Sequence, residues 1–165
     1  MDYVIDQMNP GDWEQVCSIF REGIATGYTT FEIDAPSWEK WDAGHLEIAR
    51  LVARKGDKVL GWAALSPVSN RDAYRGVAEL SVSVQEESRG RGIGRTLLEA
   101  LIERSENSEI WMLQAAIFPE NTASVKLHLR CGFREVGRRE RIGKLNGSWR
   151  DTLLFERRSK TVGVA

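Results

Sequence analysis

The chain has 165 residues, of which 42% are hydrophobic and 28% are charged, and its formal net charge is −1. These values are typical of one globular domain that buries a core without disulfides or metals. A nearly balanced charge gives no overall field that would attract nucleic acid, and no apolar run approaches the roughly 20 residues that a membrane span needs.

Cysteine usage and the N-terminal residues both bear on the compartment. Cys17 and Cys131 form a lone, distant pair, which is typical of a reducing compartment and not of a disulfide framework. Residues 1–10 contain two aspartates and no apolar core, so they do not resemble a signal peptide. We therefore predict a cytoplasmic protein.

The N-terminal part of the chain shows one strand signal and two helix signals. Residues 3–5 are predicted to form a short strand. Asn9-Pro10-Gly11-Asp12 offers helix-start chemistry, and apolar residues follow it at helical spacing. Residues 27–35 are predicted to form a loop, after which Ser37 is a candidate N-cap for a second helix.

The middle of the chain is predicted to be rich in strands. Apolar runs at residues 48–53 and 59–65 flank Lys55-Gly56-Asp57-Lys58, a pattern that predicts a β-hairpin. Residues 67–76 form a polar loop, and residues 77–84 are predicted to be the central strand.

The segments after residue 94 again alternate between helix and strand. Residues 95–104 are predicted to form a helix with its leucines and Ile102 on the inner side. Residues 110–118 resemble a strand. Pro119-Glu120-Asn121-Thr122 resembles a helix entrance, and residues 123–130 are predicted to form the helix itself.

Two strands complete the pattern, at residues 133–139 and 149–156, separated by a turn at residues 143–147. The resulting order is neither a strict βαβ repeat nor an all-β sandwich. We predict a single α/β (α+β) domain over residues 1–158 and a flexible C-terminal tail at residues 159–165.

The most informative motif is the glycine loop Arg89-Gly90-Arg91-Gly92-Ile93-Gly94, between the central strand and the next helix. Closely spaced glycines allow a tight turn in which several N–H groups point at one spot. A helix N-terminus adds partial positive charge there, which suits a phosphate or pyrophosphate. A plain glycine turn is the alternative. Walker and dinucleotide-binding loops are excluded by spacing, since Arg89 and Arg95 occupy positions that those motifs require for other residues.

A second motif, Asn121-x-x-Ser124-x-x-x-His128-x-x-x-Gly132-Phe133, follows the loop along the chain. The two motifs together resemble the GNAT superfamily of acyl-CoA-dependent N-acetyltransferases, whose cofactor loop reads Gln/Arg-x-x-Gly-x-Gly/Ala. Within it, the chain is most similar to the phosphinothricin and methionine sulfoximine acetyltransferase group. The further pieces that carry this similarity are Thr30-Phe31-Glu32, Arg71-x-Ala73-Tyr74, Glu79-x-Ser81-Val82-x-Val84, Val136-Gly137 and Gly147-x-Trp149-x-Asp151.

The resemblance implies a GNAT fold, which is a mixed, mostly antiparallel twisted sheet of about seven strands with helices on both faces. The sheet is expected to splay between the strands that end near Val84 and Phe118. The implied activity is transfer of acetyl from acetyl-CoA to the α-amine of a small amino-acid-like acceptor such as phosphinothricin or methionine sulfoximine. The resemblance also implies a homodimer. No metal is expected, and the charge and hydropathy described above predict that the protein binds neither nucleic acid nor membranes.

The resemblance also implies catalytic roles. Glu79 is the candidate base that deprotonates the amine, directly or through water; a surface glutamate is the alternative. His128 is the candidate proton donor to the departing thiolate, and a packed histidine is the alternative. A backbone N–H near Val84 is the expected oxyanion donor.

The expected cofactor site combines the central strand, the glycine loop and the start of the helix at Asn121. The strand edge would pair with the pantetheine arm, and the loop would hold the diphosphate. The predicted cofactor-binding residues are Val82, Ser83, Val84, Arg89, Gly90, Arg91, Gly92, Ile93, Gly94, Arg95, Asn121 and Ser124.

The acceptor site is less clearly marked. An acceptor carboxylate favours an arginine fork, which Arg71 or Arg75 could supply beside Tyr74, and Phe31 resembles the pocket wall of the family. The alternative for each is an exposed loop residue. Leu145 stands where the subgroup often has lysine, so the acceptor's identity is open. The alternative functions are acetylation of protein N-termini or other amine metabolites, and a non-catalytic acyl-CoA-binding module.

Overall fold

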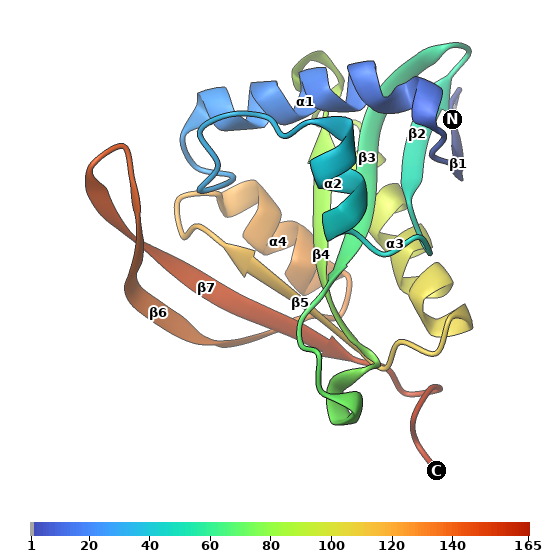
Figure 1. Ribbon diagram of the computed structural model, residues 1–165, viewed down its shortest axis with the longest axis vertical. Helices are drawn as coiled ribbons and strands as arrows, with labels where there is room; N and C mark the ends of the chain where they lie inside the picture. Colours follow the sequence, from blue (N-terminus) through green and yellow to red (C-terminus); the bar gives the residue numbers. More distant parts are fainter. Residues whose placement is uncertain (1) are drawn as a thin grey trace.

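A computed structural model describes residues 2–165 (Figure 1). The strands are β1 (Val4–Gln7), β2 (Leu51–Lys55), β3 (Lys58–Pro67), β4 (Val77–Val84), β5 (Met112–Ile117), β6 (Arg134–Leu145) and β7 (Ser148–Arg158). The helices are α1 (Trp13–Thr26), α2 (Trp38–Gly44), α3 (Ile93–Asn107) and α4 (Thr122–Arg130), with short 3-10 turns η1 (Pro10–Asp12), η2 (Asp72–Tyr74) and η3 (Glu86–Ser88). The strands form one sheet in the order β1-β2-β3-β4-β5-β7-β6, which confirms the predicted fold class.

Helices cover both faces of this sheet, as predicted (Figure 1). Successive strand residues point to opposite faces, so Val52 and Trp62 pack with α1 and α2, whereas Leu51 and Ala63 pack with α3. The leucines of α3 are fully buried. The two cores hold the central strands firmly from both sides, so the sheet is a rigid support for a site at its edge.

The strands β4 and β5 are the one parallel pair among the described strands, and their pairing is short. Their register covers only Val77↔Met112, Ala78↔Leu113 and Glu79↔Gln114. The remaining residues of β4 continue without β5 as a partner, while β3 pairs along its other edge. The sheet therefore splays where the sequence predicted, with Glu79 and Gln114 at the apex.

Two predicted boundaries were wrong. Residues 48–50 are a loop and not the start of a strand, because the buried Arg50 guanidinium donates to the carbonyls of Leu46 and His45 and fixes the chain there. The predicted turn at 143–147 is much shorter, because β6 runs to Leu145. Only Asn146 and Gly147 make the turn, with φ of 50° and 83°, as a type I′ hairpin requires.

The last residues of the chain contact α3. Ser159 is buried, and its hydroxyl donates to the carboxylate of Glu106 on that helix. Arg158 donates to the carbonyls of Val162 and Gly163. The flexibility expected for residues 159–165 stays a prediction, and these contacts extend from Ser159 to Gly163.

Candidate active site

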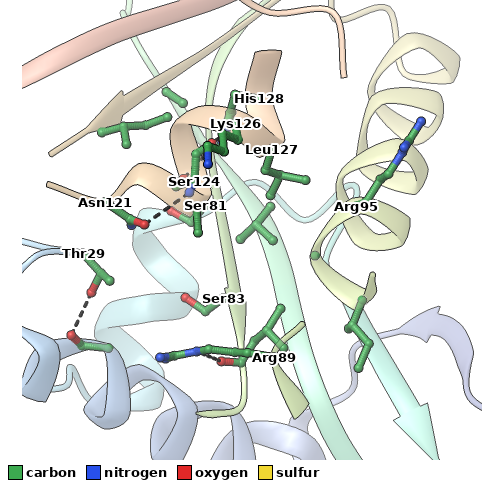
Figure 2. A pocket seen from close by; sticks show the side chains of 18 of the residues that line it. Thr29, Ser81, Ser83, Arg89, Arg95, Asn121, Ser124, Lys126, Leu127 and His128 are labelled. Carbon is green, nitrogen blue, oxygen red and sulfur yellow. Dashed lines mark hydrogen bonds between the residues drawn. The ribbon is translucent and has the colours of Figure 1, made fainter. Parts of the chain in front are cut away.

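A cavity of about 840 Å³ lies where β4 and β5 separate (Figure 2). Its walls come from β4, the end of β5, the glycine loop, the start of α3, one face of α4, and α1 with the loop after it. The predicted cofactor-binding residues that line it are Val82, Ser83, Val84, Arg89, Gly90, Gly92, Ile93, Gly94, Arg95, Asn121 and Ser124. Arg91 instead borders a separate hollow beside Lys55, Lys58 and Glu87.

The β4 side of the cavity is an open strand edge. Because pairing with β5 stops at Glu79, the backbone N–H and C=O groups that point from residues 80–84 toward β5 have no strand partner. Such groups seek hydrogen bonds with an extended, amide-bearing chain. The edge is therefore suited to bind a ligand that carries peptide-like amides.

The glycine loop forms the end of the cavity at α3. Gly90 and Gly92 have φ of 79° and 80°, a left-handed conformation that glycine adopts at little cost. Gly92 is the N-cap of α3, and its carbonyl accepts from the Thr96 amide at 3.1 Å. The first amides of a helix have no acceptor within it, so those after Gly92 offer a site for an anion.

The two arginines at this end of the cavity, Arg95 and Arg89, make different contacts. Arg95 is paired with Glu99 at 2.7 Å, one helical turn further along α3. Arg89 folds back so that its Nε donates to the Val84 carbonyl at 3.3 Å. Both guanidinium groups are thus held through Nε, and the backbone amides add donors of fixed direction.

Glu79 lies at the apex of the splay, one residue before the β4 residues that line the cavity. The Nε2 of Gln114 on β5 donates to Glu79 Oε1 at 3.0 Å, across the last register pair of the two strands. This contact fixes the position of one carboxylate oxygen, Oε1. Gln114 was not among the predicted site residues, although it is the one uncharged polar residue in the apolar run 110–118.

Asn121, Ser124 and His128 lie along α4, which borders the cavity (Figure 2). Their spacing of three and four residues places them on one helix face. Asn121 caps α4, since its side-chain oxygen accepts from the Ser124 amide at 3.2 Å. The Ser124 carbonyl in turn accepts from His128 Nδ1 at 2.7 Å.

His128 is buried, with 3% of its surface exposed, and its ring packs edge-on against Phe133 at 5.1 Å between centroids. Burial lowers the pKa of His128 because it disfavours the charged ring, although the hydrogen bond to the Ser124 carbonyl opposes this in part. The proton of the neutral ring is therefore on Nδ1. Nε2 is buried and has no protein partner among the described residues.

We expect His128 to be neutral, with its proton on Nδ1, at pH 7. Two-dimensional ¹H–¹⁵N NMR of the imidazole nitrogens should show this tautomer, with a titration midpoint below the ordinary value of 6.5. The chain has only one other histidine, His45, so a His128→Gln variant assigns the signals. An imidazolium ring at pH 7 would contradict the environment described above.

The predicted acceptor-binding residues are not brought together. Phe31 is 36% exposed and packs against Phe118, which lines the cavity, at 4.8 Å between ring centroids. Arg71, Tyr74 and Arg75 lie on or beside η2 and do not line the cavity. Their roles in acceptor binding stay predictions.

Several cavity residues were not predicted as binding residues. Tyr28, Thr29 and Thr30 come from the loop after α1, and Ser81 shares its β4 face with Glu79 and Ser83. The alternation of β4 was the available signal for Ser81, because every second residue of a strand points to the same face.

Within residues 2–165, no three side chains of histidine, cysteine, aspartate or glutamate gather closely enough to hold a metal ion. Over the same range, none of the helices has both the length and the apolar character that crossing a bilayer requires.

Comparison with known proteins gives one family. The model of the acetyltransferase (GNAT) family matches residues 13–133. The chain is 35% identical over 155 residues to a phosphinothricin N-acetyltransferase of Alcaligenes faecalis, covering 88% of this chain and 77% of that protein. It is 39% identical over 99 residues to an L-methionine sulfoximine/L-methionine sulfone acetyltransferase of Pseudomonas aeruginosa, covering 60% and 58% respectively.

Solved structures agree with the fold. A GNAT superfamily phosphinothricin acetyltransferase from Sinorhizobium meliloti, solved in complex with acetyl-CoA, superposes with a TM-score of 0.88 at 28% identity, covering 100% of this chain and 92% of that one. A ribosomal-protein-alanine N-acetyltransferase from Brucella melitensis superposes with a TM-score of 0.86 at 29% identity, covering 94% and 99%. These two structures are named for different acceptors, phosphinothricin in the first and ribosomal-protein alanine in the second.

Proposed function

The chain belongs to the acetyltransferase (GNAT) family, and from this premise we propose that it transfers acetyl from acetyl-CoA to the α-amine of a small amino-acid-like acceptor. Phosphinothricin and methionine sulfoximine are the leading acceptors. The observation that carries this proposal is the similarity, over most of both chains, to the phosphinothricin N-acetyltransferase of Alcaligenes faecalis.

The cavity can hold acetyl-CoA as an extended substrate. The diphosphate would accept hydrogen bonds from the backbone amides of residues 90–95 at the start of α3. The pantetheine arm, which carries two amides, would pair with the open edge of Val82–Val84. Asn121 and Ser124 would border the arm from α4. This placement directs the thioester toward the apex of the splay.

Glu79 would act as the base at that apex. The attacking amine must lose a proton to present its lone pair, and a carboxylate can take that proton directly or through one water. Gln114 would hold the carboxylate in place by its 3.0 Å hydrogen bond. The nitrogen then attacks the thioester carbon, and a backbone N–H near Val84 would stabilise the resulting oxyanion.

His128 would serve the leaving thiolate. Because the neutral ring keeps its proton at Nδ1 for the Ser124 carbonyl, Nε2 must first take up a proton before it can donate one. The N–H of the tetrahedral intermediate can supply that proton. The C–S bond then breaks, and the proton passes from Nε2 to the sulfur of coenzyme A.

A direct test is an acceptor screen in which release of the coenzyme A thiol is measured. We expect kcat/KM for methionine sulfoximine or phosphinothricin to exceed that for alanine-terminated peptides by at least about tenfold. The peptide is the second candidate acceptor, because the Brucella melitensis structure named for ribosomal-protein alanine superposes closely. A preference for peptides would refute the proposed acceptor class.

Homodimerisation and a cytoplasmic location are further parts of the proposal. The long β6–β7 hairpin exposes the apolar side chains Val136, Ile142 and Trp149, which supports an association between copies. The nearly neutral net charge supports a partner other than nucleic acid. Cysteine usage supports the reducing compartment.

A further inference from the structure

We propose that Arg150 of β7 binds the carboxylate of the acceptor, in a subsite that it forms with Phe31 and Phe118. This inference rests on the proposed function. The sequence motifs did not identify Arg150 as a binding residue. It lies on β7, where the β6–β7 hairpin meets the loop after α1.

Three contacts bring the residues of this subsite together. Arg150 is the cross-strand partner of Gly143, and the Phe31 ring lies directly over that glycine, where an added Cβ would be only 3.0 Å from Phe31 Cε1. Phe31 packs edge-on against Phe118 at 4.8 Å. The Arg150 guanidinium carbon stacks over Phe118 at 4.4 Å from the ring centroid.

The subsite borders the cavity already described. Phe118 and residues 28–30 line that cavity. The Arg150 Nη1 donates to the Gly27 carbonyl at 2.9 Å, immediately before this segment. The guanidinium is thus held beside Phe118 at the border of the cavity, and its loop and aromatic partners fix its position.

The charge of Arg150 is incompletely neutralised. Its side chain is 20% exposed, whereas its one carboxylate partner, Glu120, is 59% exposed and lies 3.4 Å from Nη2. A long, solvent-exposed ion pair of this kind contributes little. A guanidinium has five N–H donors, and only two of them are engaged by Gly27 and Glu120.

A planar guanidinium with spare donors matches a carboxylate in shape and charge, and partial desolvation strengthens such a pair. The predicted alternatives are less suited. None of the three arginines Arg71, Arg75 and Arg150 is itself a lining residue. However, Arg150 lies over Phe118, which lines the cavity, whereas Arg75 lies over Trp111, which does not. The aromatic walls beside Arg150 would contact the aliphatic part of an amino acid.

The test compares two acceptors on two enzymes. One acceptor is methionine sulfoximine, and the other is the primary amine that lacks its carboxylate. For Arg150→Gln, we expect kcat/KM for the amino acid to fall by about 30-fold, mainly through KM, while that for the amine changes by less than about threefold. Calorimetry should give an unchanged Kd for acetyl-CoA.

Two further variants keep the test decisive. Arg150→Lys keeps the charge and the fold but lacks the planar fork, so it should lose about tenfold on the amino acid alone. Arg139→Gln, at an exposed position on the same hairpin, is the matched control and should behave as the wild type.

Each outcome has a distinct meaning. Equal losses on both acceptors would show that Arg150 only anchors the Gly27 loop, and this would overturn the inference. An amino-acid-specific loss in Arg71→Gln or Arg75→Gln, without one in Arg150→Gln, would also overturn it. If the wild-type enzyme acetylates peptides and neither small acceptor, the proposed function itself fails.

Discussion

The Glu79→Gln enzyme is expected to bind acetyl-CoA with wild-type affinity but to transfer acetyl at a rate lowered by about 10²-fold or more. The substitution keeps the shape of the side chain and removes the carboxylate that would accept the amine proton. Stopped-flow or steady-state thiol release gives kcat, and calorimetry gives the Kd for acetyl-CoA. Glu79 lies at the apex of the splay and outside the cofactor wall, so only the chemical step should change.

Glu103→Gln is the matched control, because Glu103 is exposed on α3. The Glu103→Gln substitution removes a carboxylate that does not line the cavity. A wild-type kcat for Glu79→Gln with normal cofactor binding would exclude Glu79 as the base. Gln114→Met should reproduce part of the loss, since it removes the 3.0 Å hydrogen bond that holds the carboxylate in place.

The fold could be predicted from the sequence largely because its hydrophobic periods are clear. The run 77–84 has the alternation that a strand requires, and the leucines of α3 have the spacing that a helix requires. The error at residues 48–50 arose because apolar periodicity carries no information about a buried guanidinium. Arg50 binds the carbonyls after α2 only once those carbonyls have been brought to it by folding.

The cavity walls proposed to hold the cofactor could be predicted for a related reason. They come mainly from two contiguous segments, residues 82–95 and the start of α4, so short motifs encode them. Arg91 is the exception, since it lies within the loop but points to another hollow. A motif identifies a turn, but the side-chain directions within the turn depend on φ values such as those of Gly90 and Gly92.

The proposed acceptor subsite could not be predicted from local sequence, because its residues come from distant segments. Gly27, Phe118 and Arg150 meet only in the folded chain, and their separation is as large as 123 residues for the Arg150–Gly27 hydrogen bond. Gln114 meets Glu79 across 35 residues through a parallel strand pair. Neither pairing produces a periodic pattern in the sequence, so both became evident only in the structure.

The second large effect is expected at Gly92, the N-cap of α3. Gly92→Glu should weaken acetyl-CoA binding by about 100-fold, because it adds a negative charge next to the amides proposed to hold the diphosphate. The added side chain would meet no atom within 4 Å of its Cβ, so crowding is not the cause. The φ of 80° also strains any residue other than glycine and should lower thermal stability.

Two controls separate charge from strain in this experiment. Gly92→Ala carries the same backbone strain without the charge, so its melting temperature should fall as in Gly92→Glu while its Kd changes by less than about threefold. Gly137→Glu adds the charge on β6, where the Cβ also meets open space and the φ is not positive. Equal Kd values for Gly92→Ala and Gly92→Glu would mean that no phosphate lies at this turn, because a charge repels a phosphate whereas a methyl group does not.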